Sequence, residues 1–141
     1  MKYDDASWHY GGDFPTDSPE EYSGVHIALF MKWCFLKGWA GDIHVSETDT
    51  KKVIEGSLTA TEFFFKYCDR KFTDEDLNEE GNIFAAQYYG DEGLYLNDFA
   101  ENFGDQMYVS PESEFNYPKF SKMLDRRYKS KGLVKKPFWK L

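Results

Sequence analysis

Apolar residues recur at helical spacing through most of the chain. Nowhere do apolar and polar residues alternate for long enough to predict an extended sheet. Residues 25–36 carry apolar side chains on nearly every side, which predicts a buried central helix. Further helices are predicted over residues 46–56, 59–68, 73–89 and 97–103, and from Pro118 onward. The pattern therefore predicts a mainly α fold, a compact single-domain bundle of about five or six helices with at most a minor short strand pair.

Capping residues mark the predicted helix boundaries. Ser18 followed by Glu21 has the spacing of a capping box at the start of the central helix. Gly38 is suited to the left-handed position that ends this helix. Comparable caps open the helices that begin at Thr59 and Thr73. We therefore expect the central helix to begin near residue 19 and to end at residue 38.

The whole chain, residues 1–141, is predicted to form one domain, because no repeat, linker or low-complexity segment divides it. Residues 1–17 are predicted to be an ordered aromatic loop. In this loop Trp8 and Phe14 should be buried against the central helix, and Gly11-Gly12 should allow the backbone to turn. Residues 130–141 are predicted to be a basic C-terminal tail.

Charge is distributed unevenly along the chain, whose net charge is -8. Residues 119–141 hold nine of the 17 basic residues and only one of the 25 acidic residues. Residues 1–118 therefore carry eight basic and 24 acidic residues, a net charge of -16. An acidic body of this kind repels phosphates, so we expect no binding to nucleic acid.

The apolar segments indicate a cytoplasmic protein that does not enter a membrane. The longest apolar run, residues 25–36, is shorter than the roughly 20 residues that a membrane span needs. The first residues lack the basic and apolar regions of a secretory signal. Cys34 and Cys68 lie within apolar helical patterns, so both are expected to be reduced, buried thiols.

Motifs for catalysis or cofactor binding are absent from the sequence, so we expect neither enzymatic activity nor a cofactor. The three histidines form no metal-binding motif. Residues 74–85 begin like a calcium loop, but they lack its glycine and its final carboxylate. His26 is expected to be a hydrogen-bonded core residue and His44 an exposed turn residue. The alternative hypothesis is a small enzyme with a His/Asp site in the loop from Trp8 to Asp13. In that site His9 would act in acid–base chemistry with the carboxylates close to it in sequence, Asp4, Asp5 and Asp13.

The strongest functional signal is electrostatic. Residues 72–118 contain no lysine or arginine, but they hold twelve carboxylates with tyrosines between them. Such a surface attracts a basic protein, and tyrosines are common anchors at interfaces. A solvated acidic face is the alternative interpretation. The residues predicted to bind the partner are Tyr88, Tyr89, Asp91, Glu92, Tyr95, Asp98 and Glu101.

The opening Tyr3-Asp4-Asp5-Ala6-Ser7-Trp8-His9-Tyr10-Gly11-Gly12-Asp13-Phe14-Pro15 resembles the signature of an uncharacterised bacterial domain family. The resemblance extends over nearly the whole chain, through the apolar helix at 25–36 to the closing segment Asp125-Arg126-Arg127-Tyr128, and it implies no catalytic residue. In size, charge and lack of catalytic motifs the chain also resembles the immunity proteins encoded beside bacterial toxins. That resemblance implies an inhibitor that binds and neutralises a cognate toxin domain, with a nuclease as the expected toxin. A regulatory protein-interaction domain is a further alternative, and the oligomeric state is left open.

Overall fold

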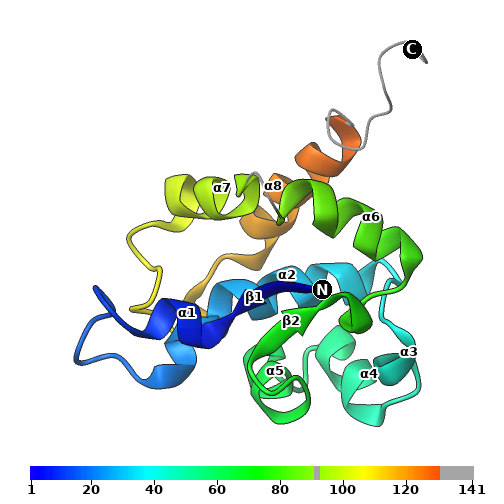
Figure 1. The fold of residues 1–141 in the computed structure, drawn as a ribbon, viewed down its shortest axis with the longest axis horizontal. Helices are drawn as coiled ribbons and strands as arrows, with labels where there is room; N and C mark the ends of the chain where they lie inside the picture. The colour runs from blue at the N-terminus through cyan, green and yellow to red at the C-terminus, as the bar shows by residue number, and fades with distance from the viewer. Residues whose placement is uncertain (91–92, 131–141) are drawn as a thin grey trace.

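The computed structural model describes residues 1–90 and 93–130, and it confirms a mainly helical fold (Figure 1). In order along the chain, the elements are β1 (Lys2–Asp5), α1 (Ala6–Tyr10), α2 (Val25–Leu36), α3 (Asp42–Val45), α4 (Thr48–Glu55), α5 (Ala60–Tyr67), β2 (Lys71–Thr73), α6 (Glu79–Tyr88), α7 (Leu94–Phe103) and α8 (Tyr117–Ser130). Short 3-10 helices lie at Glu20–Gly24, Asp74–Asp76 and Glu112–Glu114. The helices that the sequence pattern missed are the short α1 and α3, which are too brief to show a period.

Helix α2 runs through the middle of the molecule, as its continuous apolar pattern predicts. In Figure 1 it lies between α3, α4 and α5 on one side and α6, α7 and α8 on the other. All of its residues are buried except Lys32, which is half-buried, and Leu36, which is exposed. The ring of Phe30 lies within 6.4 Å of five other aromatic rings, between centroids. The core is therefore an aromatic cluster centred on α2.

The ends of the helices agree only partly with the caps in the sequence. Helix α2 is followed by Gly38 with a φ of +82°, as expected for a left-handed ending. Its start differs, because residues 20–24 form a 3-10 helix and α2 begins only at Val25. Thr73 caps the 3-10 helix at Asp74–Asp76, and α6 begins later, with Asn78 as its cap. The extended residue between them, Leu77, bridges to Ala40, and this interrupts the helix that the pattern predicted.

The first residues form a strand and a helix, and not the loop predicted for residues 1–17. β1 pairs with β2 in an antiparallel ladder that joins Asp4 to Phe72 and Asp5 to Lys71. The Asp5 carboxylate then caps α1 by accepting hydrogen bonds from the N–H and hydroxyl of Ser7. Strands of three and four residues are too short to show alternation, which explains why this sheet could be expected only as a minor strand pair.

Helix α1 reverses the burial predicted for its aromatic residues. Trp8 was expected in the core, but 61% of its surface is exposed. The residues that point inward from α1 are Ala6, which is buried, and His9, which is half-buried. Successive helical residues point about 100° apart, so residues three positions apart share a face. Trp8 and Tyr10 therefore face solvent while His9 faces α2.

Three other expectations concern the cysteines, a possible membrane span and the C-terminal tail. Cys34 and Cys68 are free and buried, as predicted. No helix within residues 1–90 and 93–130 is long and apolar enough to cross a membrane. Of the predicted basic tail at 130–141, only Ser130, the last residue of α8, lies among the described residues.

Candidate functional site

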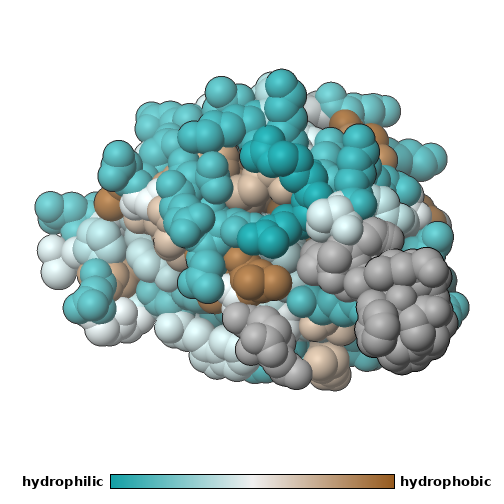
Figure 2. Space-filling view, turned by 90° about the horizontal axis from the view of Figure 1, so that it is seen from above, coloured by the Kyte–Doolittle hydropathy of each residue, from teal (hydrophilic) through white to brown (hydrophobic). Residues whose placement is uncertain are grey.

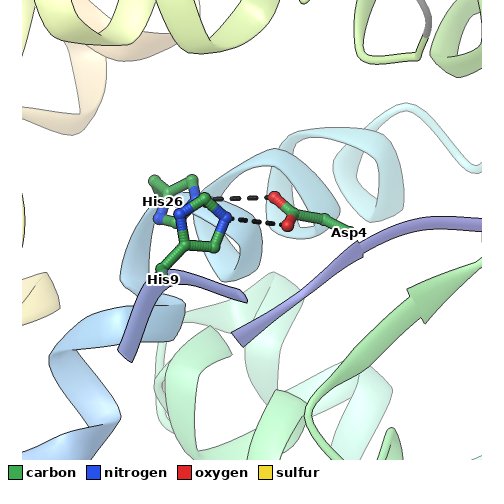
Figure 3. A group of neighbouring side chains, drawn as sticks. All are labelled: Asp4, His9 and His26. Carbon is green, nitrogen blue, oxygen red and sulfur yellow. Dashed lines mark hydrogen bonds and ion pairs between the residues drawn. The ribbon is translucent and has the colours of Figure 1, made fainter. Parts of the chain in front are cut away.

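Two histidines and one aspartate converge where β1, α1 and α2 meet (Figure 3). The Nε2 atom of His9 lies 2.7 Å from Oδ1 of Asp4. The Nε2 atom of His26 lies 3.5 Å from Oδ2 of the same carboxylate and 3.3 Å from Nε2 of His9. Strand β1 supplies Asp4, α1 supplies His9, and the first turn of α2 supplies His26. We call these three residues the His/Asp cluster.

The His/Asp cluster lies just below the surface. The exposed fraction of the side chain is 3% for Asp4, 1% for His26 and 12% for His9. Burial alone would raise the pKa of Asp4, but hydrogen bonds and charge from His26 and His9 outweigh it and leave the pKa well below its usual range. Burial lowers the pKa of His26. Asp4 is therefore an ionised carboxylate held by two imidazoles.

A second layer of polar groups orients the cluster. Asp4 also accepts hydrogen bonds from the backbone N–H of Asp5 and from the hydroxyl of Tyr89. The hydroxyl of Tyr108 lies 2.5 Å from Nδ1 of His9, and burial raises the pKa of Tyr108 to about 12. Tyr108 has a φ of +69°, a strained conformation for a bulky residue. The backbone thus accepts strain at the residue whose hydroxyl fixes the His9 ring.

The sequence drew attention to the two histidines of this cluster, but it did not place them together. His26 is buried and hydrogen-bonded, as predicted, and His9 is near a carboxylate. The carboxylate is Asp4, whereas Asp13, which the enzyme hypothesis placed in the site, is exposed. Asp4 was one of three aspartates near His9 in the sequence, but the spacing did not show which of them contacts the ring, because it crosses from a strand into a helix. The contribution of Tyr108 depends on a contact between residues 99 positions apart.

A second group of potential ligands is formed by His44, Cys68 and Asp76. The Nε2 atom of His44 lies 2.8 Å from Asp76 Oδ1, and the sulfur of Cys68 lies 3.6 Å from that oxygen and 3.8 Å from Nε2. All three are buried, so the prediction that His44 is exposed was wrong. The ring packs between Phe35 and Phe63. Burial, together with Asp76, raises the pKa of Cys68, so this thiol is not an activated nucleophile.

The tyrosines predicted to anchor a partner are core residues. Tyr88, Tyr89 and Tyr95 are all buried, whereas the sequence interpretation left at most one of the adjacent pair in the core. Tyr88 is the last residue of α6 and Tyr89 is its C-cap, and the two rings are buried against different partners. Tyr89 lies against Phe30 and reaches Asp4, and Tyr88 hydrogen-bonds Asp98. These tyrosines are unavailable to a partner in this conformation.

The predicted charge partners fall into three groups. Asp98 is buried and forms two hydrogen bonds with Arg127 of α8, at 2.8 and 3.0 Å. Glu101 is exposed. Asp91 and Glu92 lie outside the residues that the structure describes. Figure 2 shows that the face over α6, α7 and α8 is largely hydrophilic, with separate apolar patches.

The ion pair between Asp98 and Arg127 should make the free energy of unfolding depend on pH in the acidic range. Burial tends to raise the pKa of Asp98, but hydrogen bonds from Arg127 and Tyr88 leave it below the usual value. The stabilisation is therefore complete above the unfolded pKa of about 3.9 and is lost as the pH falls through the lower folded pKa. We expect Asp98→Asn to lower the free energy of unfolding by about 1–2 kcal/mol at neutral pH, because Arg127 is partly exposed. The loss should shrink in acid.

Urea unfolding of both proteins at neutral and strongly acidic pH measures this difference. The matched control is Glu101→Gln, an exposed carboxylate on the same helix, whose effect should be close to zero. An equal loss for Asp98→Asn at both pH values would show that the charge of Asp98 does not contribute.

A surface groove lies away from the His/Asp cluster, and no residue of the cluster lines it. It has a volume of about 810 Å³ and runs between the 3-10 helix at Glu20–Gly24, the start of α5 and residues 111–113. The carboxylate of Glu112 caps the N-terminal end of α5 by accepting hydrogen bonds from the backbone N–H groups of Ala60 and Thr61. Among the described residues, no histidine or cysteine lines this groove.

The fold and site define a mainly α-helical domain with a small antiparallel sheet and a subsurface His/Asp cluster. Residues 2–111 match a family described as a domain of unknown function, DUF7832, and the chain belongs to this family. No curated protein matches the chain, and no solved structure matches it either. An uncharacterised domain family was expected from the sequence, and this part of the expectation is confirmed.

Proposed function

We propose that this protein is an immunity-type inhibitor that binds and neutralises a bacterial toxin domain, with a nuclease as the expected toxin. The observation that carries the proposal is the exposure of Trp8, at 61%, on a helix of an acidic protein. Tryptophan is a frequent hot spot at protein interfaces, and Trp8 is exposed together with Tyr10 of the same short helix. The opening motif that includes Trp8 lies within the matched range of the family.

The partner-binding surface proposed here differs from the one predicted from the sequence. Trp8 and Tyr10 of α1 are exposed, and Phe14 packs against Tyr108, which places the first segment beside residues 104–110 (Figure 1). These later residues belong to the cation-free acidic stretch. We define the α1 face by the exposed residues Trp8, Tyr10 and Asp13 of the first segment. It combines two aromatic anchors with a carboxylate, which suits a basic partner.

Further support comes from acidic side chains that remain on the surface. Within residues 72–118, apart from the two positions that the structure does not describe, exposed carboxylates occur at Glu75, Glu79, Glu80, Glu101, Asp105 and Glu114. A nuclease presents a basic cleft to phosphates, and such carboxylates would speed its association with the inhibitor.

Trp8→Ala should weaken binding to the toxin domain encoded by a neighbouring gene by at least about 2 kcal/mol, or roughly 30-fold in Kd. Folding should change by no more than about 0.5 kcal/mol, because the ring is exposed. Isothermal titration of the purified pair measures the first effect and urea unfolding the second. The control is Ile83→Ala, an exposed apolar residue on α6. Equal affinity of Trp8→Ala and the wild type would remove the α1 face from the interface, and failure of the wild type to form a complex would overturn the proposed function.

An enzyme with its site at the first segment is the second candidate. The observation that favours it is the convergence of His9, His26 and Asp4, in which His9 retains some exposure. The two hypotheses differ in what they require of His9. A catalytic base must be within reach of the substrate, whereas an inhibitor requires only the surrounding surface. His9→Asn should abolish turnover if the protein is an enzyme, and it should leave the affinity for the toxin unchanged if the protein is an inhibitor.

A further inference from the structure

The atoms of the His/Asp cluster have the spacing of metal ligands. Zinc binds imidazole nitrogen and carboxylate oxygen at about 2.0–2.2 Å, so two ligands of a tetrahedral ion lie about 3.3–3.5 Å apart. The two Nε2 atoms are separated by 3.3 Å, and Nε2 of His26 is 3.5 Å from the carboxylate of Asp4. The 2.7 Å contact of His9 with Asp4 is a hydrogen bond and would lengthen around an ion. Figure 3 shows the three side chains pointing toward one another from three elements.

The hydrogen-bonding options of the two rings also favour a bound cation. Both Nε2 atoms face the Asp4 carboxylate, and only one hydrogen can lie between nitrogens that are 3.3 Å apart. Nδ1 of the buried His26 has no hydrogen-bond partner among the described residues, so Nε2 is the nitrogen of that ring with polar neighbours. A cation would take the lone pairs of both Nε2 atoms at once, and the Asp4 carboxylate would offset part of its charge.

The outer contacts resemble those that orient metal ligands. A ligating imidazole commonly holds a polar group on its other nitrogen, and a ligating carboxylate is itself hydrogen-bonded. His9 has the Tyr108 hydroxyl on Nδ1, and Asp4 has the Asp5 N–H and the Tyr89 hydroxyl. His26 is an exception, because its Nδ1 has no hydrogen-bond partner among the described residues. The strained backbone of Tyr108 is accounted for if its hydroxyl must hold His9 in the orientation of a ligand.

Access favours this cluster over the group formed by His44, Cys68 and Asp76. That second group is enclosed in the core, and Asp76 is already committed to the cap of a 3-10 helix. In the His/Asp cluster, by contrast, 12% of the His9 side chain is exposed to solvent.

We propose that Asp4, His9 and His26 form a binding site for a divalent cation of the zinc type, with two imidazole nitrogens and one carboxylate as the protein ligands. The ion joins β1, α1 and α2, and its remaining coordination position opens toward the exposed side of His9. This site does not depend on the proposed toxin binding, because it uses none of the exposed residues of the α1 face.

Zinc chloride titrated into EDTA-treated, dialysed protein tests the site, and cobalt(II) serves as a spectroscopic probe. We expect equimolar binding and visible cobalt absorption of tetrahedral intensity. His9→Asn should weaken zinc binding by more than about 100-fold, and Tyr108→Phe by about 10-fold, since an outer hydrogen bond commonly changes affinity by 10–100-fold. Cys68→Ser is the matched control and should bind zinc as the wild type does. Circular dichroism of each zinc-free variant confirms that it is folded.

Two results would overturn the proposal. One is the absence of both zinc binding and cobalt absorption in the folded wild-type protein. The other is binding that survives in His9→Asn and is lost in Cys68→Ser, which would place the ion at the second group. If His9→Asn does not fold, Tyr108→Phe decides, because it leaves all three ligands in place and changes only the orientation of His9.

Discussion

Phe30→Ala lowers the free energy of unfolding by about 3–5 kcal/mol, the range for a large buried aromatic residue reduced to alanine. Phe30 is fully buried at the middle of α2, and its ring is near those of Phe72, Phe84, Tyr89 and Tyr95. Its removal leaves a cavity that rigid rings cannot collapse to fill. A domain with a total stability of roughly 5–15 kcal/mol would lose a large part of it.

Urea unfolding monitored by circular dichroism measures this loss. Phe30→Leu should lose less, because leucine fills part of the same space, and it provides a folded variant if alanine is too destabilising. Ile83→Ala on the exposed side of α6 should change stability by no more than about 0.5 kcal/mol. A comparable loss in Ile83→Ala and Phe30→Ala would contradict the central position of Phe30.

Asp4→Ala is the second large effect, at about 3–5 kcal/mol, the cost of removing one partner from a buried polar pair. The substitution removes an acceptor from the His9 ring, the Tyr89 hydroxyl and the Asp5 N–H, and it leaves these groups in a buried space. Each buried donor without a partner costs roughly 1–3 kcal/mol. Because the donors come from different elements, the loss should loosen β1 and α1 together.

The measurement is the free energy of unfolding in the presence of EDTA, so that it does not depend on a bound ion. Asp13→Ala is the matched control, since Asp13 is an exposed aspartate nine residues further along the same segment. It should have little effect. Equal stability of Asp4→Ala and Asp13→Ala would show that the buried network contributes nothing to the fold.

The sequence predicted the elements whose pattern is long and local. The apolar run of α2 and the cap of α5 at Thr59 depend on neighbouring residues, and both are present in the structure. Helix boundaries were predicted less accurately where tertiary contacts outweigh a capping residue. Thr73 has the residues of a helix cap, but the helix that follows it is a single 3-10 turn because Leu77 is drawn into a bridge with Ala40.

The side chains of the site could not be assigned from local patterns. An aromatic residue in a polar segment has no sequence feature that tells whether it faces inward, so the positions of Trp8 and Tyr95 were both predicted wrongly. The direction of α1 is set by the strand before it, which depends on residues about 70 positions away. His9 was recognised as the most interesting histidine because carboxylates surround it in sequence. The sequence did not indicate which carboxylate it contacts, Asp4, or that Tyr108, 99 positions away, contacts its other ring nitrogen.

The pairing of β1 with β2 has a consequence for the order in which the protein folds. Lys2 is joined to Thr73, so this ladder closes a loop of about 70 residues, and such closure is slow compared with helix formation. During synthesis β1 is made first, but it has to wait until β2 has been made. Helices α2, α4 and α5 lie between the two strands in the chain and can pack against one another earlier. The segment that carries Trp8 and His9 should therefore reach its native position late in folding, after the core around α2 has formed.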